Sequence, residues 1–129
     1  MSPTILTKDN QVAFVVGTPG GSTIFTSVFQ TIVNILDFGM QPLEAVGATR
    51  FHHQLLPPDL ITMSIASPLP EETISALGDR GYRVEPHNFE FGDVQVIWRN
   101  QGELLPAADP RDRGVAKVIE ISATEAAQK

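Results

Sequence analysis

The sequence predicts an α+β fold in which a mixed, mostly antiparallel sheet is packed with helices. Apolar runs typical of strands are interleaved along the chain with segments of helical periodicity. Two strand-like runs, at residues 4–7 and 12–17, are separated only by a short polar break, which indicates a hairpin. This hairpin argues against a purely parallel, doubly wound sheet.

The two opening strands differ in their pattern. The break between them is Lys8-Asp9-Asn10-Gln11, and the first strand before it is rich in β-branched residues. The second run, Val12–Val16, is continuously apolar. A run of this kind is typical of a strand that lies in the middle of a sheet and is covered on both faces.

The most regular segment is an amphipathic helix of about four turns. Ser22 or Thr23 is expected to cap its start, and Gly39 lies near its end. Most polar residues fall on the side opposite an apolar stripe with a four-residue repeat. The residues of that repeat are Ile24, Val28, Ile32 and Leu36.

A second, shorter helix is expected to begin at Pro42, because proline is favoured in the first helical turn. Its residues Leu43 and Val46 are predicted to face inward. The following segment, residues 49–59, contains no periodicity and is predicted to be irregular.

The second half of the chain is predicted to hold short strands and one helix. These are strands over residues 61–65, 82–85, 94–98 and 103–107, a helix that opens at Pro70 and ends at Gly81, and a turn at residues 100–102. No core pattern is present from residue 112 onward, and residues 122–129 have the composition of a loose tail.

Composition excludes several classes of function. The 129 residues suffice for one domain, and the absence of cysteine excludes disulfide frameworks, thiolate catalysis and cysteine-ligated zinc. The net charge of −6, without a cluster of basic residues, disfavours nucleic acid as a partner. Polar residues interrupt the apolar stretch 24–38, so no membrane span is expected. Residues 1–4 lack the pattern of a signal peptide, which leaves the localisation open.

The sharpest candidate for chemistry is the turn Gly17-Thr18-Pro19-Gly20-Gly21-Ser22, between the apolar strand and the long helix. Glycines let the backbone approach a ligand, and a helix N-terminus offers free N–H groups and a partial positive charge. Such a turn suits a phosphate, a carboxylate or a developing oxyanion, although it matches neither the Walker nor the dinucleotide pattern. The alternative is that Gly20 and Gly21 merely make a tight turn.

The remaining polar residues indicate structural roles. His52 and His53 are neighbours in extended chain, so their side chains point opposite ways, and no spacing joins His87 to them. No metal site and no cofactor is therefore predicted. Asp109-Pro110-Arg111 suits either a local ion pair or an anion site. No serine or threonine lies in a recognisable nucleophile motif.

Seven short strings in a fixed order along the chain are characteristic when they are taken together. They are Met1-Ser2-Pro3-Thr4-Ile5, Gly17-Thr18-Pro19-Gly20-Gly21-Ser22, Asp37-Phe38-Gly39-Met40, Glu44-Ala45-Val46, Arg50-Phe51-His52-His53-Gln54, Gly102-Glu103-Leu104 and Asp109-Pro110-Arg111. Each string alone is weak, but the ordered set is specific. Over about residues 1–116 the chain resembles the C-terminal region of the small subunit of gamma-glutamyltransferase, which leaves 117–129 as a C-terminal tail.

The resemblance implies the fold and chemistry of the N-terminal-nucleophile hydrolases, which have four αββα layers. In this family, also called gamma-glutamyltranspeptidase or glutathione hydrolase, autoproteolysis frees a threonine that attacks the gamma-glutamyl amide of glutathione or related compounds. The glutamyl group then passes to water, an amino acid or a peptide. Gly20 and Gly21 match the family's glycine pair, whose amides form the oxyanion hole. The resemblance implies the same catalytic and substrate-binding role for them here.

The sequence also departs from the family in ways that limit this expectation. The nucleophilic threonine and the paired serines that bind the glutamyl carboxylate lie upstream of Met1 in the family, and the large subunit with its substrate-binding arginine has no counterpart. Thr4, Thr18 and Thr23 are not substitutes for that nucleophile. The chain is therefore expected to be an inactive fragment on its own, which partners the absent segments or a second copy of itself.

Two alternatives stay open. The chain could be a non-catalytic module that binds small carboxylates at the glycine turn, or a structural fragment that pairs with a partner chain. Members of the family are commonly periplasmic, secreted or surface-anchored. The choice of substrate within the family, which includes related acylases, is not determined by these residues.

Overall fold

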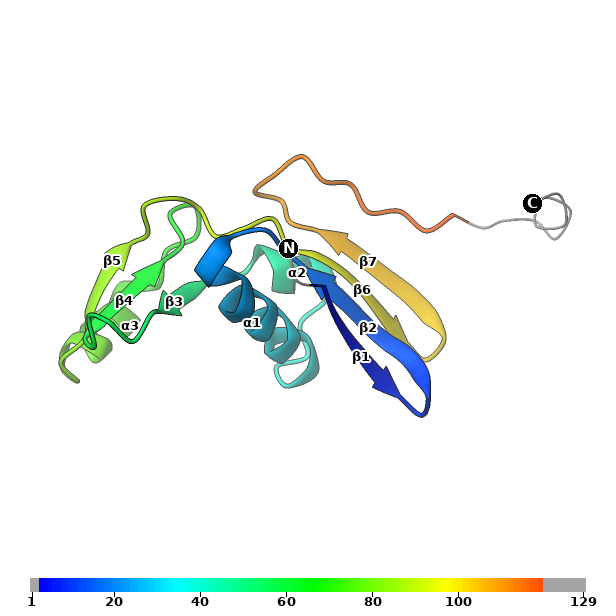
Figure 1. Cartoon of the computed structure of the whole chain (residues 1–129), viewed down its shortest axis with the longest axis horizontal. Coiled ribbons are helices and arrows are strands. Elements are labelled where there is room, and N and C mark those ends of the chain that lie inside the picture. The colour runs from blue at the N-terminus through cyan, green and yellow to red at the C-terminus, as the bar shows by residue number, and fades with distance from the viewer. Residues whose placement is uncertain (1–2, 120–129) are drawn as a thin grey trace, which may run out of the picture.

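Two β-sheets, with two helices between them, make up the fold (Figure 1). The computed structural model describes residues 3–119. The elements in this part of the chain are β1 (Thr4–Lys8), β2 (Gln11–Gly17), the 3-10 turn η1 (Gly21–Thr23), α1 (Ile24–Leu36), α2 (Pro42–Gly47), β3 (Phe51–His53), β4 (Leu60–Met63), α3 (Glu71–Gly78), β5 (Arg83–Pro86), β6 (Gln95–Asn100) and β7 (Glu103–Ala108).

The larger sheet has the order β1-β2-β6-β7, and every pair in it is antiparallel. Both of its hairpin turns contain residues with positive φ, at Asp9 and Asn10 and again at Gln101 and Gly102. Two successive residues of this kind form the turn whose twist matches antiparallel strands. The predicted hairpin and the predicted turn at residues 100–102 are confirmed.

The smaller sheet has the order β3-β4-β5. Strands β3 and β4 are antiparallel, whereas β4 and β5 are parallel and α3 connects them. The prediction of a mixed, mostly antiparallel arrangement is confirmed. Two details were wrong: residues 49–59 contain the strand β3, and Ile65 lies beyond the end of β4.

The start of α1 differs from the prediction. Neither Ser22 nor Thr23 caps the helix with its side chain. Residues 21–23 instead form a tight 3-10 turn, in which the Thr23 hydroxyl donates a hydrogen bond of 2.9 Å to the Gly20 carbonyl. At the other end the chain leaves the helix through Gly39, which has a φ of 69°.

The face of α1 that packs on the core includes most of the predicted stripe. Val28 is buried, and Ile24 and Ile32 pack against the core, whereas Leu36 is 52% exposed. Ser27, Val28, Thr31 and Ile35 are its buried residues. Phe25 and Phe29, which flank the predicted stripe, are 63% and 65% exposed. In α2, likewise, Val46 is buried as predicted but Leu43 is exposed, because only one side of that short helix meets the sheet.

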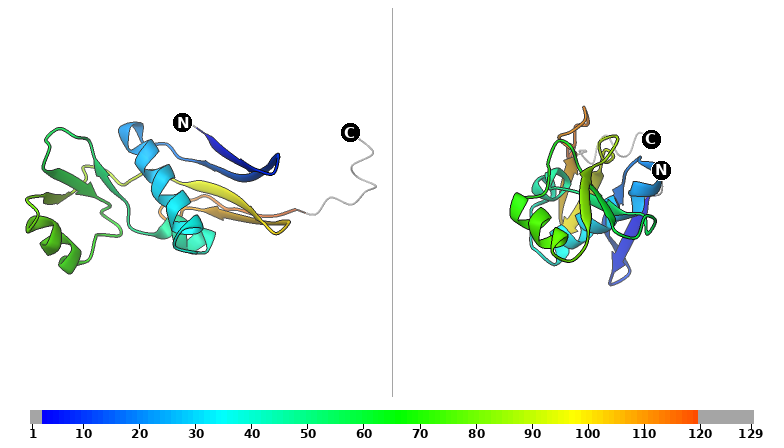
Figure 2. Two further views of the ribbon diagram at one scale, coloured as in Figure 1. Left: turned by 90° about the horizontal axis from the view of Figure 1, so that it is seen from below. Right: turned by 90° about the vertical axis from the view of Figure 1, so that its left-hand side faces the viewer.

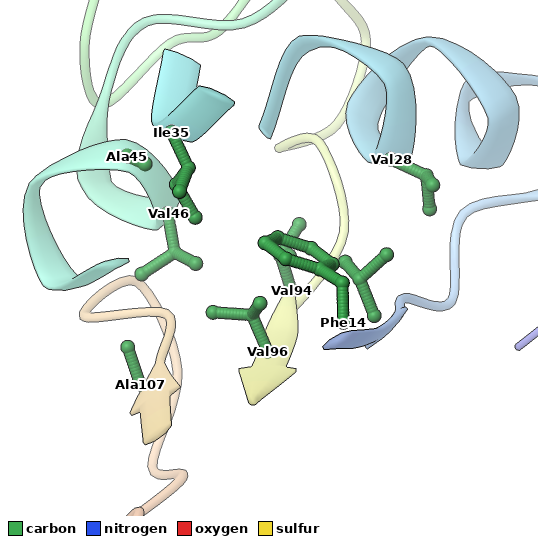
Figure 3. Packing of buried hydrophobic residues seen from close by; sticks show 9 residues of the cluster. Phe14, Val28, Ile35, Ala45, Val46, Val94, Val96 and Ala107 are labelled. Atoms are coloured by element: carbon green, nitrogen blue, oxygen red, sulfur yellow. The ribbon is translucent and has the colours of Figure 1, made fainter. Parts of the chain in front are cut away.

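The hydrophobic core lies between these helices and one face of the larger sheet (Figure 3). Phe14 of β2 points into this core, and Val16 of the same strand also belongs to it; both side chains are 2% exposed or less. The other face of β2 is not covered, so the prediction that both faces of Val12–Val16 are buried was wrong for this chain. Strand β2 does lie in the middle of its sheet, as expected.

Figure 2 shows that α1 crosses between the two sheets. Its N-terminal end, with the turn that precedes it, therefore lies where both sheets are near. Across residues 3–119, no helix is long and apolar enough to cross a membrane. The predicted tail at residues 117–129 falls mostly outside the described residues.

Candidate functional site

The glycine turn connects β2 to α1 with an unusual backbone. Gly20 has φ 138° and ψ 11°, and Gly21 has a φ of 58°. L-amino acids with side chains disfavour both conformations. A Cβ atom on Gly20 would lie 2.7 Å from the Thr23 hydroxyl oxygen, whereas one on Gly21 would meet nothing within 4 Å. Gly20 is thus required by contact as well as by conformation, and Gly21 faces open space.

Hydrogen bonds fix both peptide planes of this turn. The Pro19 carbonyl accepts a bond of 2.8 Å from the Thr18 hydroxyl. The Gly20 carbonyl accepts bonds from the Thr23 amide, at 3.1 Å, and the Thr23 hydroxyl. Because the C=O and N–H of a trans peptide point in opposite directions, the amides of Gly20 and Gly21 are turned away from these partners.

The two glycine amides, those of Gly20 and Gly21, have no hydrogen-bond partner in the described part of the protein, residues 3–119. Two adjacent backbone donors at a turn that leads into a helix can form a site for negative charge. The arrangement can hold a carboxylate, or stabilise the oxyanion of a tetrahedral intermediate.

Two hollows flank the turn. One, of about 540 Å³, extends from Thr4 and Gly21 along the exposed apolar side of α1. The other, of about 290 Å³, is more polar and is lined among others by His52 and His87. Ser22 and Gln54 line both hollows, so the turn stands at the surface with open space on two sides.

The histidines have partners within the protein. His52 is buried, with its Nδ1 3.0 Å from the Thr26 hydroxyl and its Nε2 2.6 Å from the Gln54 side-chain oxygen. His53 and His87 contact backbone carbonyl oxygens. Within the described residues, no three His, Cys, Asp or Glu side chains are grouped as a metal site requires.

Asp109-Pro110-Arg111 forms an ion-pair cluster. Asp109 is fully buried and pairs at 2.5 Å with Arg50, which is 1% exposed. Burial lowers the pKa of the Arg50 guanidinium, while the hydrogen bond and charge of Asp109 oppose that shift. Arg111 contacts the same carboxylate at 3.1 Å. Of the two roles left open for this motif, the structure shows the ion pair.

This cluster also caps the C-terminal end of α2. The Arg111 guanidinium donates to the carbonyls of Val46, Gly47 and Ala48, at 2.7 to 2.9 Å. Arginine is a favourable partner for the free carbonyls at a helix C-terminus. Arg111 is also 3.4 Å from Glu90, which links the cluster to the loop before β6.

That loop contains a residue that sequence reasoning missed. Gly92 has a φ of 48°, and a Cβ atom there would lie 2.6 Å from the Pro19 carbonyl oxygen. The next amide, that of Asp93, donates to the Thr18 hydroxyl across 75 positions of sequence. Partial burial raises the pKa of the Asp93 carboxyl, against the hydrogen bond from Gln95. A lone glycine before a strand was the only signal for this contact.

Comparisons with known proteins agree on one family. The family model described as gamma-glutamyltranspeptidase matches residues 1–119. The chain is 47% identical over 119 residues to the glutathione hydrolase proenzyme of Pseudomonas aeruginosa, and 40% identical over 111 residues to that of Escherichia coli. These alignments cover 92% and 86% of the chain.

Solved structures give the same picture. The gamma-glutamyltranspeptidase of Pseudomonas nitroreducens complexed with L-DON superimposes with a TM-score of 0.87 and 46% identity, over 93% of this chain and 62% of that one. Nearly the whole of this chain therefore shares the fold of the matching part of that structure. The chain spans about a fifth of the length of the curated relatives it matches.

Proposed function

This chain belongs to the gamma-glutamyltranspeptidase family, and from that membership we propose that it supplies the oxyanion-binding amides of Gly20 and Gly21 to gamma-glutamyl transfer. The donors would be glutathione and related gamma-glutamyl compounds, and the acceptors water or amino acids. The observation that carries the proposal is the orientation of the two amides, which point away from the anchored carbonyls and have no acceptor within residues 3–119.

The chemistry requires such donors. When a nucleophile attacks the gamma-glutamyl carbonyl, its oxygen becomes a tetrahedral oxyanion, and fixed N–H groups stabilise this charge without reorganisation. Removal of one donor from an oxyanion hole typically lowers kcat by about 10²–10³. The hydroxyls of Thr18 and Thr23, the two threonines of the turn, donate to backbone carbonyls, and the family's nucleophilic threonine has no match in this sequence. The isolated chain is therefore proposed to be inactive.

A hybrid protein tests the proposal. Residues 1–119 would replace the matching segment of the Pseudomonas aeruginosa glutathione hydrolase proenzyme, and release of a chromophore from a gamma-glutamyl anilide would be followed. We expect turnover by the hybrid and none by the 129-residue chain. A hybrid that folds and matures but does not turn over contradicts the proposed role, and turnover by the isolated chain contradicts its inactivity.

A second candidate function, pairing with a partner chain, is supported by the uncovered face of the larger sheet. Ile5, Ile97 and Leu104 of that face are 45% to 59% exposed, which is typical of a surface that packs on another protein segment. A module that only binds carboxylates makes a different prediction: calorimetric titration of the 129-residue chain with glutamate or glutathione would then show binding without a partner.

A further inference from the structure

We propose that Thr18 and Thr23 are positioning residues whose hydroxyl groups set the direction of the two glycine amides. Each hydroxyl holds the carbonyl of one peptide plane, and the N–H of the same plane thereby points away from that hydroxyl. The catalytic part of this inference rests on the proposed function. The geometric part does not, and it can be tested on the 129-residue chain.

Thr18 holds the first of the two peptide planes, which joins Pro19 to Gly20. Its side chain is fully buried, and its hydroxyl donates to the Pro19 carbonyl at 2.8 Å while it accepts from the Asp93 amide at 3.0 Å. Because the Asp93 amide occupies one lone pair of the oxygen, the hydroxyl is held between two backbone groups. The plane that contains the Pro19 carbonyl also contains the Gly20 amide, which must then point the opposite way.

Thr23 holds the second peptide plane, which joins Gly20 to Gly21. It is also fully buried, and both its amide and its hydroxyl donate to the Gly20 carbonyl, at 3.1 and 2.9 Å. That carbonyl shares its plane with the Gly21 amide. Since the Thr23 amide remains when its hydroxyl is removed, this plane keeps one of its two anchors in a valine variant.

Gly92 provides the space that this arrangement needs. Any side chain at this position would press on the Pro19 carbonyl oxygen, 2.6 Å from the place of its Cβ atom, and still more closely on the Thr18 hydroxyl. Within residues 3–119, Thr18 is the one recorded donor to the Pro19 carbonyl. The first plane therefore depends on Thr18 more than the second depends on Thr23.

Amide residual dipolar couplings of the 129-residue chain test the geometric part. Valine variants of the two threonines remove the hydroxyl and keep the size of the side chain. T18V should change the coupling of the Gly20 amide most, and T23V that of the Gly21 amide by a smaller amount. The matched control is T31V, since Thr31 is 1% exposed and its hydroxyl donates to the Ser27 carbonyl at 2.9 Å within α1.

Kinetics of the hybrid enzyme test the catalytic part. T18V should lower kcat about tenfold or more, with KM within about twofold, because misplaced donors stabilise the transition state less than fixed ones. T18S, which keeps the hydroxyl, should restore kcat, and T31V should leave it unchanged.

Two results would overturn the inference. One is an unchanged Gly20 coupling in T18V; the other is a T18V hybrid whose kcat equals that of T31V. A wild-type hybrid without activity would instead contradict the proposed function. In that case the couplings alone decide whether the threonines orient the amides.

Discussion

Two charged residues, Arg50 and Asp109, are the most deeply buried ionic groups of the described chain. A buried ion pair recovers its desolvation penalty only when the geometry is good and the remaining polar atoms are also bonded. Here Arg50 also donates to the carbonyls of Val46 and Phe91, and Asp109 accepts from the Val94 amide, whereas the buried Arg50 Nε has no partner among the described residues. The pair thereby joins α2, the loop before β6 and the end of β7.

Replacement of Asp109 by asparagine should destabilise the chain by roughly 3–5 kcal/mol, because it leaves the buried Arg50 without a counter-charge. Urea unfolding of the 129-residue chain measures this. The control is D59N, since Asp59 pairs with Arg83 at the surface and both side chains are largely exposed. Equal losses of stability in the two variants would show that burial does not govern the cost.

The lowered pKa of the Glu90 carboxyl leads us to expect that the stability of the chain depends on pH. Burial alone would raise this pKa, but hydrogen bonds from the Ser64 hydroxyl and the amides of Ala66 and Phe91, with the charge of Arg111, lower it below the ordinary value of 4.5. A lowered pKa stabilises the folded state above about pH 4.5, and this contribution is lost as the pH falls through the folded-state pKa.

The difference in unfolding free energy between the wild type and E90Q should therefore shrink between pH 7 and pH 3.5. Urea titrations at the two pH values provide the comparison. A difference that stays constant, or grows on acidification, would contradict the lowered pKa of Glu90.

At the scale of elements, α1 shows what periodicity can and cannot predict. The four-residue repeat correctly predicted the helix and its length, because that pattern belongs to the segment itself. The repeat also predicted most of the packed side, but not that this side extends to Thr31 and Ile35 and leaves Leu36 exposed. Val28 is buried whereas Phe29, on the next position, is 65% exposed. The orientation depends on the position of β2 and α2, which the helix sequence does not contain.

Side chains on the two sides of α1 should therefore differ in how much their replacement by alanine lowers the free energy of unfolding. Ile35→Ala should cost about 2–5 kcal/mol, since this side chain is 2% exposed and its removal leaves a cavity. Phe29→Ala should change the unfolding free energy of the isolated chain far less, because the ring is mostly in solvent. Chemical denaturation measures both. A larger loss for Phe29→Ala would mean that the other face of α1 is the packed one.

The glycine turn could be predicted because its signal is local in the sequence. The contacts that hold the turn in place could not be predicted in this way. Two adjacent glycines, Gly20 and Gly21, stand between an apolar strand and a helical repeat. This short pattern indicates a turn whose backbone conformation favours glycine. The contact of Thr18 with Asp93 spans 75 positions and depends on the pairing of β2 with β6. Pairing of that kind follows from the assembled sheet, so no local pattern reveals it.

At the scale of the whole molecule, the larger sheet has one covered and one uncovered face. A row of apolar residues crosses all four strands on the uncovered face, because Ile5, Val15, Ile97 and Pro106 are successive register partners. The resemblance implied four αββα layers. This chain by itself shows a sheet with helices on one side, and the row of apolar residues marks the side on which a further layer would pack.

The isolated chain should accordingly self-associate at micromolar concentration, as measured by light scattering. Ile97→Glu places a charge in the middle of the row and should shift the population toward the monomer. Ser75→Glu adds the same charge at an exposed position on α3 and should not. A monomeric wild-type chain, or an equal effect of both variants, would show that this face does not drive association.

Two glycine variants of the hybrid enzyme test the role of the turn most directly. Gly20→Ala brings a methyl group to 2.7 Å from the Thr23 hydroxyl and disturbs the glycine turn, while Gly39→Ala places alanine at a φ of 69° in open space at the end of α1. We expect Gly20→Ala to lower kcat about a hundredfold with little change in KM, and Gly39→Ala to leave kcat within about twofold. Equal kcat values for the two variants would contradict the role of the Gly20 and Gly21 amides.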